Sequence, residues 1–394
     1  MNDVIELSEQ QLRRKNNAKW TMHGQTVLPA SVAEMDFALA PAIKAAIERI
    51  ATIEDYGYAM RQGEPAESLL GQAFAQRMQA RFGWQVDAER VVPVTNLVQA
   101  IFAAVSVFSQ PGDAVALQLP AFPPLHMAVN DTGRRLIPIR LQPQNGRYVH
   151  DLDDLKAQVD ARTRVLLICN PQNPTGCVFD RDELLRLTAF AVERDMVIVS
   201  DEIHADLIFD NRHHIPVGTL GAEIAARTVT LNAASKSFNI AGLRCGVMHF
   251  GSIELQSRFQ AAFPKQLLGA PGVVGIMATI AAWEEGQPWL DAAVRKLQTT
   301  RDHLVARLQA ELPAARFIPP EATYLAWIDF SGLDLRESAF RHFLERGVAL
   351  GAGEMFDAPC SAFGRLNFAT SLSLLDRIID CMVGKTGRVP ASER

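Results

Sequence analysis

The sequence has few cysteines and no long apolar run, and these shortages exclude several classes of protein. Its five cysteines include no CxxC pair, so neither a zinc knuckle nor a redox dithiol is indicated. The longest apolar run, about residues 273–283, is far shorter than a bilayer span, and the first twenty residues lack the apolar core of a signal peptide. We therefore expect no membrane association and a cytoplasmic protein with reduced thiols.

Positive charge is not in excess either. Lysine and arginine number 39 against 44 acidic residues, which gives a net charge of −5 and argues against a nucleic-acid partner. The motifs GxGxxG, GxxxxGK[ST], HExxH and GxSxG are absent, so the usual dinucleotide, P-loop, zinc-protease and serine-hydrolase interpretations have no support. No metal site is indicated, and we expect the adjacent His213 and His214 to lie in a solvated loop.

The 394 residues have a globular composition, with 48% hydrophobic and 21% charged residues. Apolar residues at fourfold spacing predict a helix over 66–82 that Gly83 ends, and a second helix is predicted over 96–110 with Thr95 as its N-cap. Short apolar segments predict strands at 114–119, 135–141, 164–169, 196–200, 228–232 and 245–250, with a helix at about 180–194. This alternation indicates an α/β fold with a mostly parallel sheet.

The pattern changes after about residue 285. A long helix (289–312), a strand (322–329), a helix (335–346) and a strand (365–369) predict a smaller α+β domain. We therefore expect three parts, which are an N-terminal segment that packs with the small domain, a large domain and the small C-terminal domain, over residues 1–40, 41–285 and 286–394.

Four polar segments lie at or just after predicted strands, where ligands bind in open α/β sheets. They are Asn170–Gly176 (NPQNPTG), Ser200–His204, Ala233–Asn239 followed by Arg244, and Arg365–Asn367. Taken alone, each has an ordinary explanation as a turn or a solvated charge. Their order and spacing together resemble the class I/II aminotransferase-like enzymes of fold-type I, which use pyridoxal 5′-phosphate. The resemblance runs from about residue 20 to 380.

This resemblance implies a large domain with a mostly parallel, seven-stranded sheet, plus a smaller α+β domain. It implies that Lys236 bonds to the cofactor aldehyde and then moves the Cα proton of the substrate. Asp201 would pair with the pyridine nitrogen and keep the ring protonated. Asn173 would donate to the ring O3′, and His204 stands where many relatives have a tyrosine that contacts the same oxygen.

The phosphate needs amide donors and positive charge. The helix start at Asn96 and Leu97 offers unpaired N–H groups and the positive end of the helix dipole. By the resemblance, Ser235 and Arg244 complete the phosphate site.

Two further residues follow from the resemblance. Phe122 would stack on the pyridine face, and Arg365 would bind the substrate α-carboxylate as a forked pair, beside Asn173.

Three motifs in the N-terminal part indicate one branch of this family. Lys19-Trp20, Ala33–Phe37 (AEMDF) and Tyr56–Tyr58 (YGY) resemble the KW…ADMDF…(F/Y)GY pattern of cystathionine β-lyase-like C–S lyases of the MalY/PatB type. By this resemblance, Tyr58 reaches the phosphate of the neighbouring subunit, and the enzyme is a homodimer with shared active sites. Glu34 replaces the aspartate of the pattern, which puts the identity of the substrate in question.

Three functions remain open. A C–S β-lyase would cleave cystathionine-like or cysteine S-conjugate substrates to a thiol, pyruvate and ammonia. An aminotransferase would act on an amino acid and a 2-oxo acid with the same residues, so a requirement for an oxo acid separates the two. A catalytically inactive binding protein is the third alternative, and the presence of Lys236, Asp201 and Arg365 argues against it.

Overall fold

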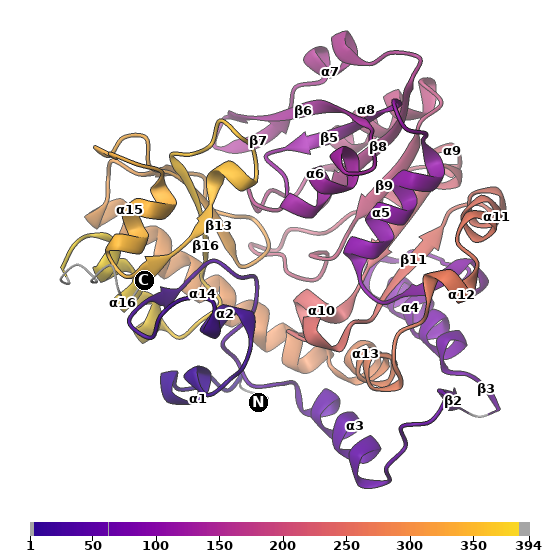
Figure 1. Cartoon of the computed structure of the whole chain (residues 1–394), viewed down its shortest axis with the longest axis horizontal. Helices are drawn as coiled ribbons and strands as arrows, with labels where there is room; N and C mark the ends of the chain where they lie inside the picture. The colour runs from indigo at the N-terminus through magenta and orange to yellow at the C-terminus, as the bar shows by residue number, and fades with distance from the viewer. Residues whose placement is uncertain (1–3, 62, 386–394) are drawn as a thin grey trace.

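The computed structural model of the chain describes residues 4–61 and 63–385 and contains a large sheet and a small one (Figure 1). Within these residues, no helix combines the length and the apolar character needed to cross a membrane.

The large sheet has eight strands in the order β4–β11–β10–β9–β8–β5–β6–β7. They are β4 (Val91–Val94), β5 (Ala114–Leu119), β6 (Arg135–Gln144), β7 (Arg147–His150), β8 (Thr163–Cys169), β9 (Val197–Asp201), β10 (Thr228–Asn232) and β11 (Gly246–Phe250). The five strands from β10 to β6 run parallel, whereas β4, β11 and β7 are antiparallel to their neighbours. The mostly parallel sheet of the predicted α/β fold is confirmed.

The sheet has one strand more than the seven expected, because β7 extends it as a hairpin with β6. The two strands are joined by Asn145-Gly146, whose φ angles are +50° and +78°. Positive φ at both positions of a two-residue connection is typical of tight hairpins, and an Asn-Gly pair favours it. The signal for the eighth strand is therefore present in the sequence.

Helices cover both faces of the large sheet, which is why its central strands are apolar throughout. One face is covered by α5 (Leu97–Phe108), α6 (Pro123–Asn130) and α11 (Ile253–Ala262). The other is covered by α7 (Leu152–Gln158), α8 (Arg181–Glu193) and α9 (Ala222–Ala226).

A further helical layer contains α4 (Ala66–Phe82), which has the predicted bounds. Gly83 ends it with φ +65°, a left-handed conformation that glycine adopts without steric cost. α4 packs with α13 (Val273–Glu285), and α13 in turn packs against α3 (Pro41–Thr52).

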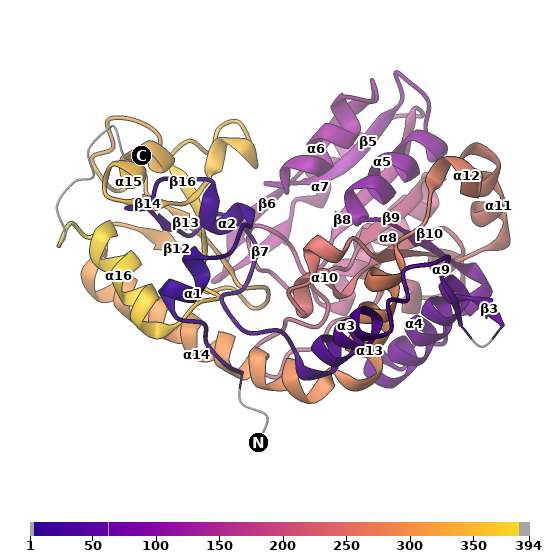
Figure 2. The same ribbon diagram turned by 60° about the horizontal axis from the view of Figure 1, so that its bottom comes forward.

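The small sheet has the order β12–β13–β16–β15, all antiparallel. Its strands are β12 (Arg316–Phe317), β13 (Leu325–Asp329), β15 (Gly351–Ala352) and β16 (Phe363–Asn367), and its helices are α14 (Gln287–Glu311), α15 (Ala339–Glu345) and α16 (Leu372–Met382). Figure 2 shows α14 running along the base of the molecule from this part towards the large sheet.

The N-terminal segment lies beside the small sheet in both views (Figures 1 and 2). It contains α1 (Glu9–Arg13), α2 (Ala18–Thr21) and β1 (Leu28–Pro29). β1 pairs in parallel with β14 (Val348–Ala349). The division into residues 1–40, 41–285 and 286–394 stays a prediction.

Candidate active site

Strand register brings the polar segments together at one edge of the large sheet. Cys169 at the end of β8 is aligned with Asp201 at the end of β9, and Asp201 is aligned with Leu231 of β10. The segments that follow these strands border a cavity of about 320 Å³. Predicted site residues that line it are Asn96, Leu97, Phe122, Asn173, Asp201, His204, Ser235, Lys236 and Arg244.

Lys236 is the lysine of this cavity. It lies on the short helix α10 (Ala234–Ser237), and its Nζ donates a hydrogen bond to the carbonyl oxygen of Ala33 at 3.1 Å. Burial, followed by the charge of Arg365, lowers the pKa of Lys236 to about 8. An amine with this pKa has a far larger neutral fraction near physiological pH than an ordinary lysine, and the neutral form can act as a nucleophile and as a base.

Asp201 is a buried carboxyl group with few partners. Its Oδ1 accepts a hydrogen bond from the backbone N–H of Ile203 at 3.1 Å. Burial, with a smaller contribution from the charge of Glu202, raises the pKa of Asp201 to about 6, although that hydrogen bond and the charge of Lys236 lower it. A cationic ligand beside Asp201 would oppose both effects and hold the carboxylate ionised.

His204 lies close to Asp201 and is also buried. Burial, and then the charges of Lys236 and Arg365, lower the pKa of His204 to about 3, so its imidazole is neutral. Its Nδ1 has no hydrogen-bond partner within the described part of the chain. The ring meets Tyr324 edge-on, with centroids 6.3 Å apart.

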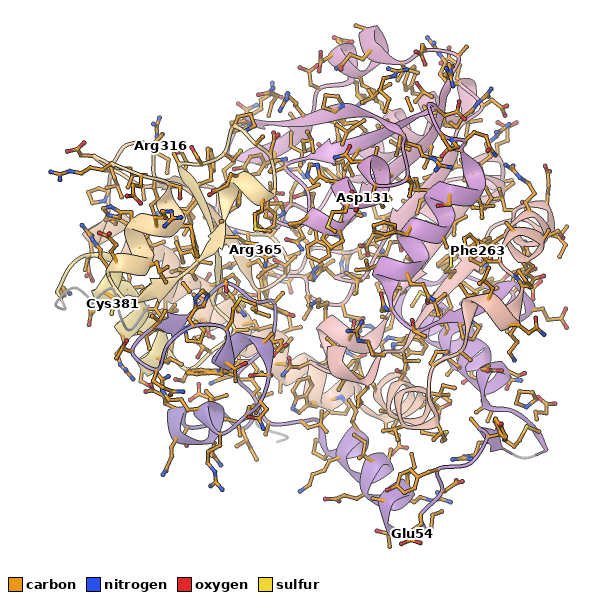
Figure 3. All side chains as sticks on the ribbon, viewed as in Figure 1. Glu54, Asp131, Phe263, Arg316, Arg365 and Cys381 are labelled. Atoms are coloured by element: carbon orange, nitrogen blue, oxygen red, sulfur yellow. The ribbon has the colours of Figure 1, made fainter. Side chains whose placement is uncertain are left out.

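Arg365, on β16, brings the small sheet to the site, and Figure 3 shows it near the centre of the molecule. Its Nη1 donates to Oδ1 of Asn173 at 3.0 Å, and its Nη2 donates to the carbonyl oxygen of Ser31 at 2.7 Å. Its guanidinium lies 4.8 Å from the ring centroid of Phe356. Because Asn173 accepts through its oxygen, its amide nitrogen remains available to donate.

Gly176 fixes the NPQNPTG loop against the small part of the chain. Its φ is +70°, and an added Cβ would lie 2.4 Å from the Cβ of Pro320. Its carbonyl oxygen accepts hydrogen bonds from the N–H groups of Glu321 and Ala322, at 3.0 and 2.9 Å. Glycine at this position therefore sets how Asn173, three residues earlier, meets Arg365.

The start of α5 forms the far end of the cavity. The N-cap is Asn96 and not Thr95 as predicted, because the Asn96 side chain accepts from the N–H of Gln99, whereas the Thr95 hydroxyl donates to the Gln99 side chain. The helix therefore begins at Leu97, and its first N–H groups point out of the helix. Arg244 has a φ of +53° and lines the same cavity.

Tyr58 does not line this cavity. Its side chain is fully exposed, beside the hairpin of β2 (Met60–Arg61) and β3 (Glu64–Pro65). Within one chain, the structure does not bring Tyr58 together with the other predicted residues.

The solvated-loop expectation is wrong for His214. Its side chain is buried, and its Nε2 lies 2.8 Å from Oε2 of Glu202. Phe82 meets the ring edge-on, with centroids 5.2 Å apart. The sequence around His214 does not indicate that its ring is buried against Glu202, because the phenylalanine that covers the ring comes from the distant helix α4.

A segment that the sequence marked only as a family signature crosses the site. We call residues 30–36 the strap. Its carbonyl oxygens accept hydrogen bonds from Lys236, Tyr324, Arg365 and Asn367. Sequence reasoning included Asn367 in the polar segment Arg365–Asn367 but missed Tyr324 as a neighbour of the site, although Tyr324 lies on a predicted strand.

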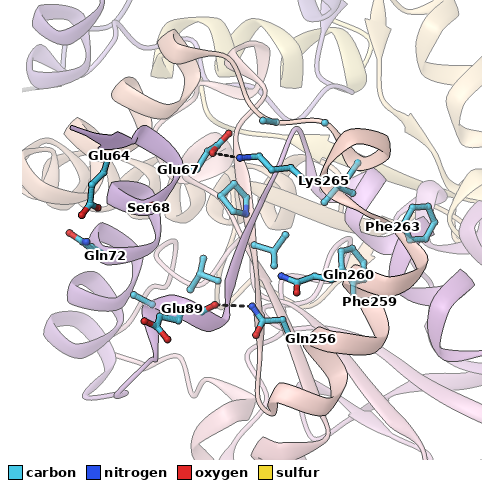
Figure 4. Close-up of a pocket in the computed structure, with 17 residues that line it drawn as sticks. Glu64, Glu67, Ser68, Gln72, Glu89, Gln256, Phe259, Gln260, Phe263 and Lys265 are labelled. Atoms are coloured by element: carbon cyan, nitrogen blue, oxygen red, sulfur yellow. Dashed lines mark hydrogen bonds and ion pairs between the residues drawn. The ribbon is translucent and has the colours of Figure 1, made fainter. Parts of the chain in front are cut away.

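A second cavity, of about 520 Å³, lies among α4, α11 and α12 (Lys265–Leu268) (Figure 4). An ion pair between Glu67 and Lys265, at 2.7 Å, crosses it. None of the predicted site residues lines this cavity.

The residues of the first cavity fit pyridoxal phosphate. Lys236 offers an amine for the aldehyde, and Asp201 offers a carboxylate for the pyridine nitrogen. The first turn of α5, with Ser235 and Arg244 beside it, offers donors for the phosphate. The unpartnered Nδ1 of His204 is a polar atom that a ligand would satisfy.

The fold and this site define a fold-type I pyridoxal-phosphate enzyme. A family model described as "Aminotransferase class I and II" matches residues 27–381, and the chain belongs to this family.

Relatives with similar sequences and solved structures with similar folds agree with this family assignment. The chain is 32% identical to "Cystathionine beta-lyase PatB" of Bacillus subtilis, over 91% of this chain and 94% of that protein. The structure named OvoB has a TM-score of 0.90 and 32% identity, covering 98% of this chain and 99% of that one. The pyridoxal-phosphate-bound C–S lyase of Staphylococcus hominis has a TM-score of 0.86 and 27% identity, covering 96% of each chain.

Proposed function

We propose that the chain is a pyridoxal-phosphate-dependent C–S β-lyase that cleaves cystathionine-like or cysteine S-conjugate substrates. The observation that carries this proposal is that Lys236 and Asp201 line one cavity and Arg365 donates a hydrogen bond to Asn173 of its lining, in a chain whose similarity to PatB extends over nine-tenths of its length. The S. hominis C–S lyase supports the same reaction class.

Arg365 binds and orients the substrate. Its Nη atoms are held by Asn173 and Ser31, so the guanidinium is fixed before the substrate arrives. Its Nε is buried and has no partner among the described residues. A substrate α-carboxylate that pairs with the fixed guanidinium has a set position, which fixes where Cα lies.

Lys236 moves the proton. Its Nζ removes the Cα proton, which requires the neutral amine that a pKa of about 8 provides. Pyridoxal phosphate, when bound, supplies the electron sink for the charge left on Cα. Asp201 stays ionised beside the pyridine nitrogen, and the carbonyl oxygen of Ala33 in the strap holds the Lys236 amine in place by a hydrogen bond.

The bonds balance without a second substrate. The C–H bond at Cα breaks first, its electron pair forms the Cα–Cβ double bond, and the Cβ–S pair leaves with sulfur as a thiolate. The thiolate takes up one proton. The unsaturated amine that remains hydrolyses in water to pyruvate and ammonia, so the lyase needs no 2-oxo acid.

The test is to incubate the holoenzyme with L-cystathionine and no oxo acid, and to measure free thiol and pyruvate. We expect the two to appear in equal amounts. If no thiol or pyruvate appears, and turnover occurs only when an amino donor and a 2-oxo acid are both present, the protein is instead an aminotransferase, the other activity of this family.

We also propose a homodimer with shared sites. The chain between α3 and β3, whose course Figure 1 shows, exposes Ile53, Tyr56, Tyr58 and Met60. Exposed apolar patches mark interaction surfaces. In this dimer, Tyr58 contacts the phosphate bound in the partner subunit.

A subunit-mixing experiment tests the shared site. Tyr58→Ala and Lys236→Ala homodimers should both be weak, and mixing them should restore activity because one hybrid site has both side chains. If mixing restores no activity while ultracentrifugation shows that hybrid dimers have formed, Tyr58 does not act across the dimer.

The five free cysteines favour a cytoplasmic location, which fractionation of cells would test.

A further inference from the structure

A cavity of about 610 Å³ borders the loop that follows Asp201 and His204, two residues of the cofactor site. Its walls come from three distant parts of the chain, which are the end of α4, residues 205–214 and positions 291–295 of α14. None of the predicted site residues lines it, so the mechanism gives this cavity no role.

Arginine side chains outnumber the acidic ones in the lining of this cavity. The charged residues that line it are Arg81, Arg212 and Arg295 on one side of the balance and Asp206 and Asp291 on the other. The exposed imidazole of His213 lies beside them. Because the chain as a whole has a net charge of −5, this local excess of positive charge favours an anion here.

The guanidinium groups of Arg295 and Arg81 are available to a ligand. The side chain of Arg295 forms no hydrogen bond or ion pair within the part of the chain that the structure describes. The Nε of Arg81 lies 3.7 Å from Asp206, whose carboxylate pairs more closely with Arg77, at 2.7 Å. Arginines without a close acceptor in a cavity match the forked oxygens of carboxylates and phosphates.

A buried pair closes the loop that lines the cavity. Nε2 of His214 lies 2.8 Å from Oε2 of Glu202, and Oε1 of Glu202 accepts from the N–H of Val217 at 3.0 Å. His214 itself lines the cavity, and its buried Nδ1 has no partner among the described residues. The loop therefore leaves the cofactor site next to Asp201 and returns to the neighbouring carboxylate.

The tip of the loop is also held in place. Asp210 and Asn211 have φ angles of +58° and +56°, which aspartate and asparagine adopt more readily than most residues. Nη2 of Arg301, on α14, donates to Asp210 at 2.8 Å. Arg212 comes next and pairs through Nη2 with Glu321 at 2.9 Å, which leaves its other guanidinium nitrogens for a ligand.

We propose that this cavity is an effector site for a small anion with carboxylate or phosphate oxygens, and that the bound anion strengthens the binding of pyridoxal phosphate. An anion that pairs with Arg212 and Arg295 joins the loop to α14. This link restrains the start of the loop, where Asp201 and His204 lie. Restraint imposed before the cofactor arrives lowers the cost of ordering these two side chains around it.

Calorimetry of the holoenzyme with inorganic phosphate and, separately, with succinate tests the site. In the holoenzyme the cofactor already occupies its own phosphate position. We expect saturable binding of both anions and none of succinamide, the uncharged counterpart of succinate. The anion that binds more tightly shows whether phosphate esters or dicarboxylates are the preferred class.

Variants locate the binding. Arg295→Gln should weaken it by about tenfold, because a hydrogen bond to a charged group is worth about that factor. Arg186→Gln, at an exposed arginine of α8 outside the cavity, is the matched control and should bind like the wild type. Succinate can also reach Arg365, so only the binding that Arg295→Gln removes is assigned to this cavity.

A cofactor titration tests the coupling. Apo-protein is titrated with pyridoxal phosphate, with and without saturating succinate, and absorbance reports the bound cofactor. Succinate should lower the dissociation constant of the wild type by about fivefold, a usual size for coupled sites, and should leave that of Arg295→Gln unchanged. Succinate replaces phosphate in this experiment because free phosphate would compete with the phosphate of the cofactor.

Three results would overturn the proposal. They are the absence of saturable anion binding, equal binding by the wild type and Arg295→Gln, and a cofactor affinity of the wild type that succinate does not raise. None of these measurements involves cleavage of a C–S bond, so the proposal fails or stands independently of the β-lyase function.

Discussion

Two lysines of this chain, the buried Lys19 and the half-buried Lys236, have opposite surroundings. Lys19 pairs with Asp36 at 2.8 Å, and the other oxygen of Asp36 accepts from the indole N–H of Trp20 at 2.9 Å. Among the described residues, Lys236 makes one hydrogen bond, to a backbone carbonyl, and no carboxyl group forms an ion pair with it. The charge of Lys19 is therefore paired within the protein, whereas the amine of Lys236 is left for a ligand.

The difference shows how buried charge can serve stability or chemistry. A paired buried charge stabilises the fold, provided that both partners remain. An unpaired buried charge costs free energy, but its perturbed pKa makes it reactive. The family pattern around Trp20 and Asp36 thus supports the strap, and the segments after the strands supply the reactive groups.

The largest expected effect is the loss of Lys236. Lys236→Ala should lower turnover by about 10⁴-fold, because no other group replaces its proton transfer. The thermal midpoint of the Lys236→Ala apo-protein should stay close to that of the wild-type apo-protein, because this side chain makes one hydrogen bond, to a backbone carbonyl. Lys44→Ala, at an exposed lysine of α3, is the control. Residual activity within tenfold of the wild type would exclude Lys236 as the base.

Loss of Lys19 should act on stability instead. Lys19→Met leaves the Asp36 carboxylate buried without its cation, which should lower the free energy of unfolding by about 3–5 kcal/mol. Urea titration measures this change. If the variant unfolds like the wild type, the Lys19–Asp36 cluster does not stabilise the strap.

Asp201→Asn should separate stability from cofactor binding. The rise in the pKa of Asp201 from 3.8 to about 6 corresponds to about 3 kcal/mol, a cost that the apo-protein bears when the group is ionised. The variant apo-protein should therefore be more stable above pH 6 and equal to the wild type below about pH 4, where the carboxyl is protonated in both states. Its affinity for pyridoxal phosphate should fall. Lower stability of the apo variant at pH 8 would contradict this account.

The smallest effect is a pH dependence. The rate at which apo-protein takes up pyridoxal phosphate should rise as pH increases through about 8, because only the neutral Lys236 amine attacks the aldehyde. Stopped-flow absorbance over a pH series measures the rate. A rate that keeps rising to about pH 10.5, the value of an ordinary lysine, would mean that burial does not perturb this amine.

The sequence predicts most of the local structure where the local signal decides it. α4 has the predicted bounds because Gly83 stops it, and β5 and β10 coincide with the predicted segments. The eighth strand was missed because the Asn145-Gly146 turn was not given its weight.

Contacts between distant residues could not be predicted in this way. Arg365 and Asn173 are 192 residues apart, and only the register of β16 and the loop at Gly176 bring them together. The burial of His214 depends likewise on Phe82 and Glu202. Spacing along the chain says nothing of such meetings, and the resemblance to a family supplied roles without these partners.

One measurement tests the contrast between the two lysines most directly. The holoenzyme is treated with borohydride, digested, and the modified peptide is identified by mass spectrometry. We predict one cofactor per chain, attached to Lys236. Label on Lys19, or a protein that takes up no cofactor, would contradict the account.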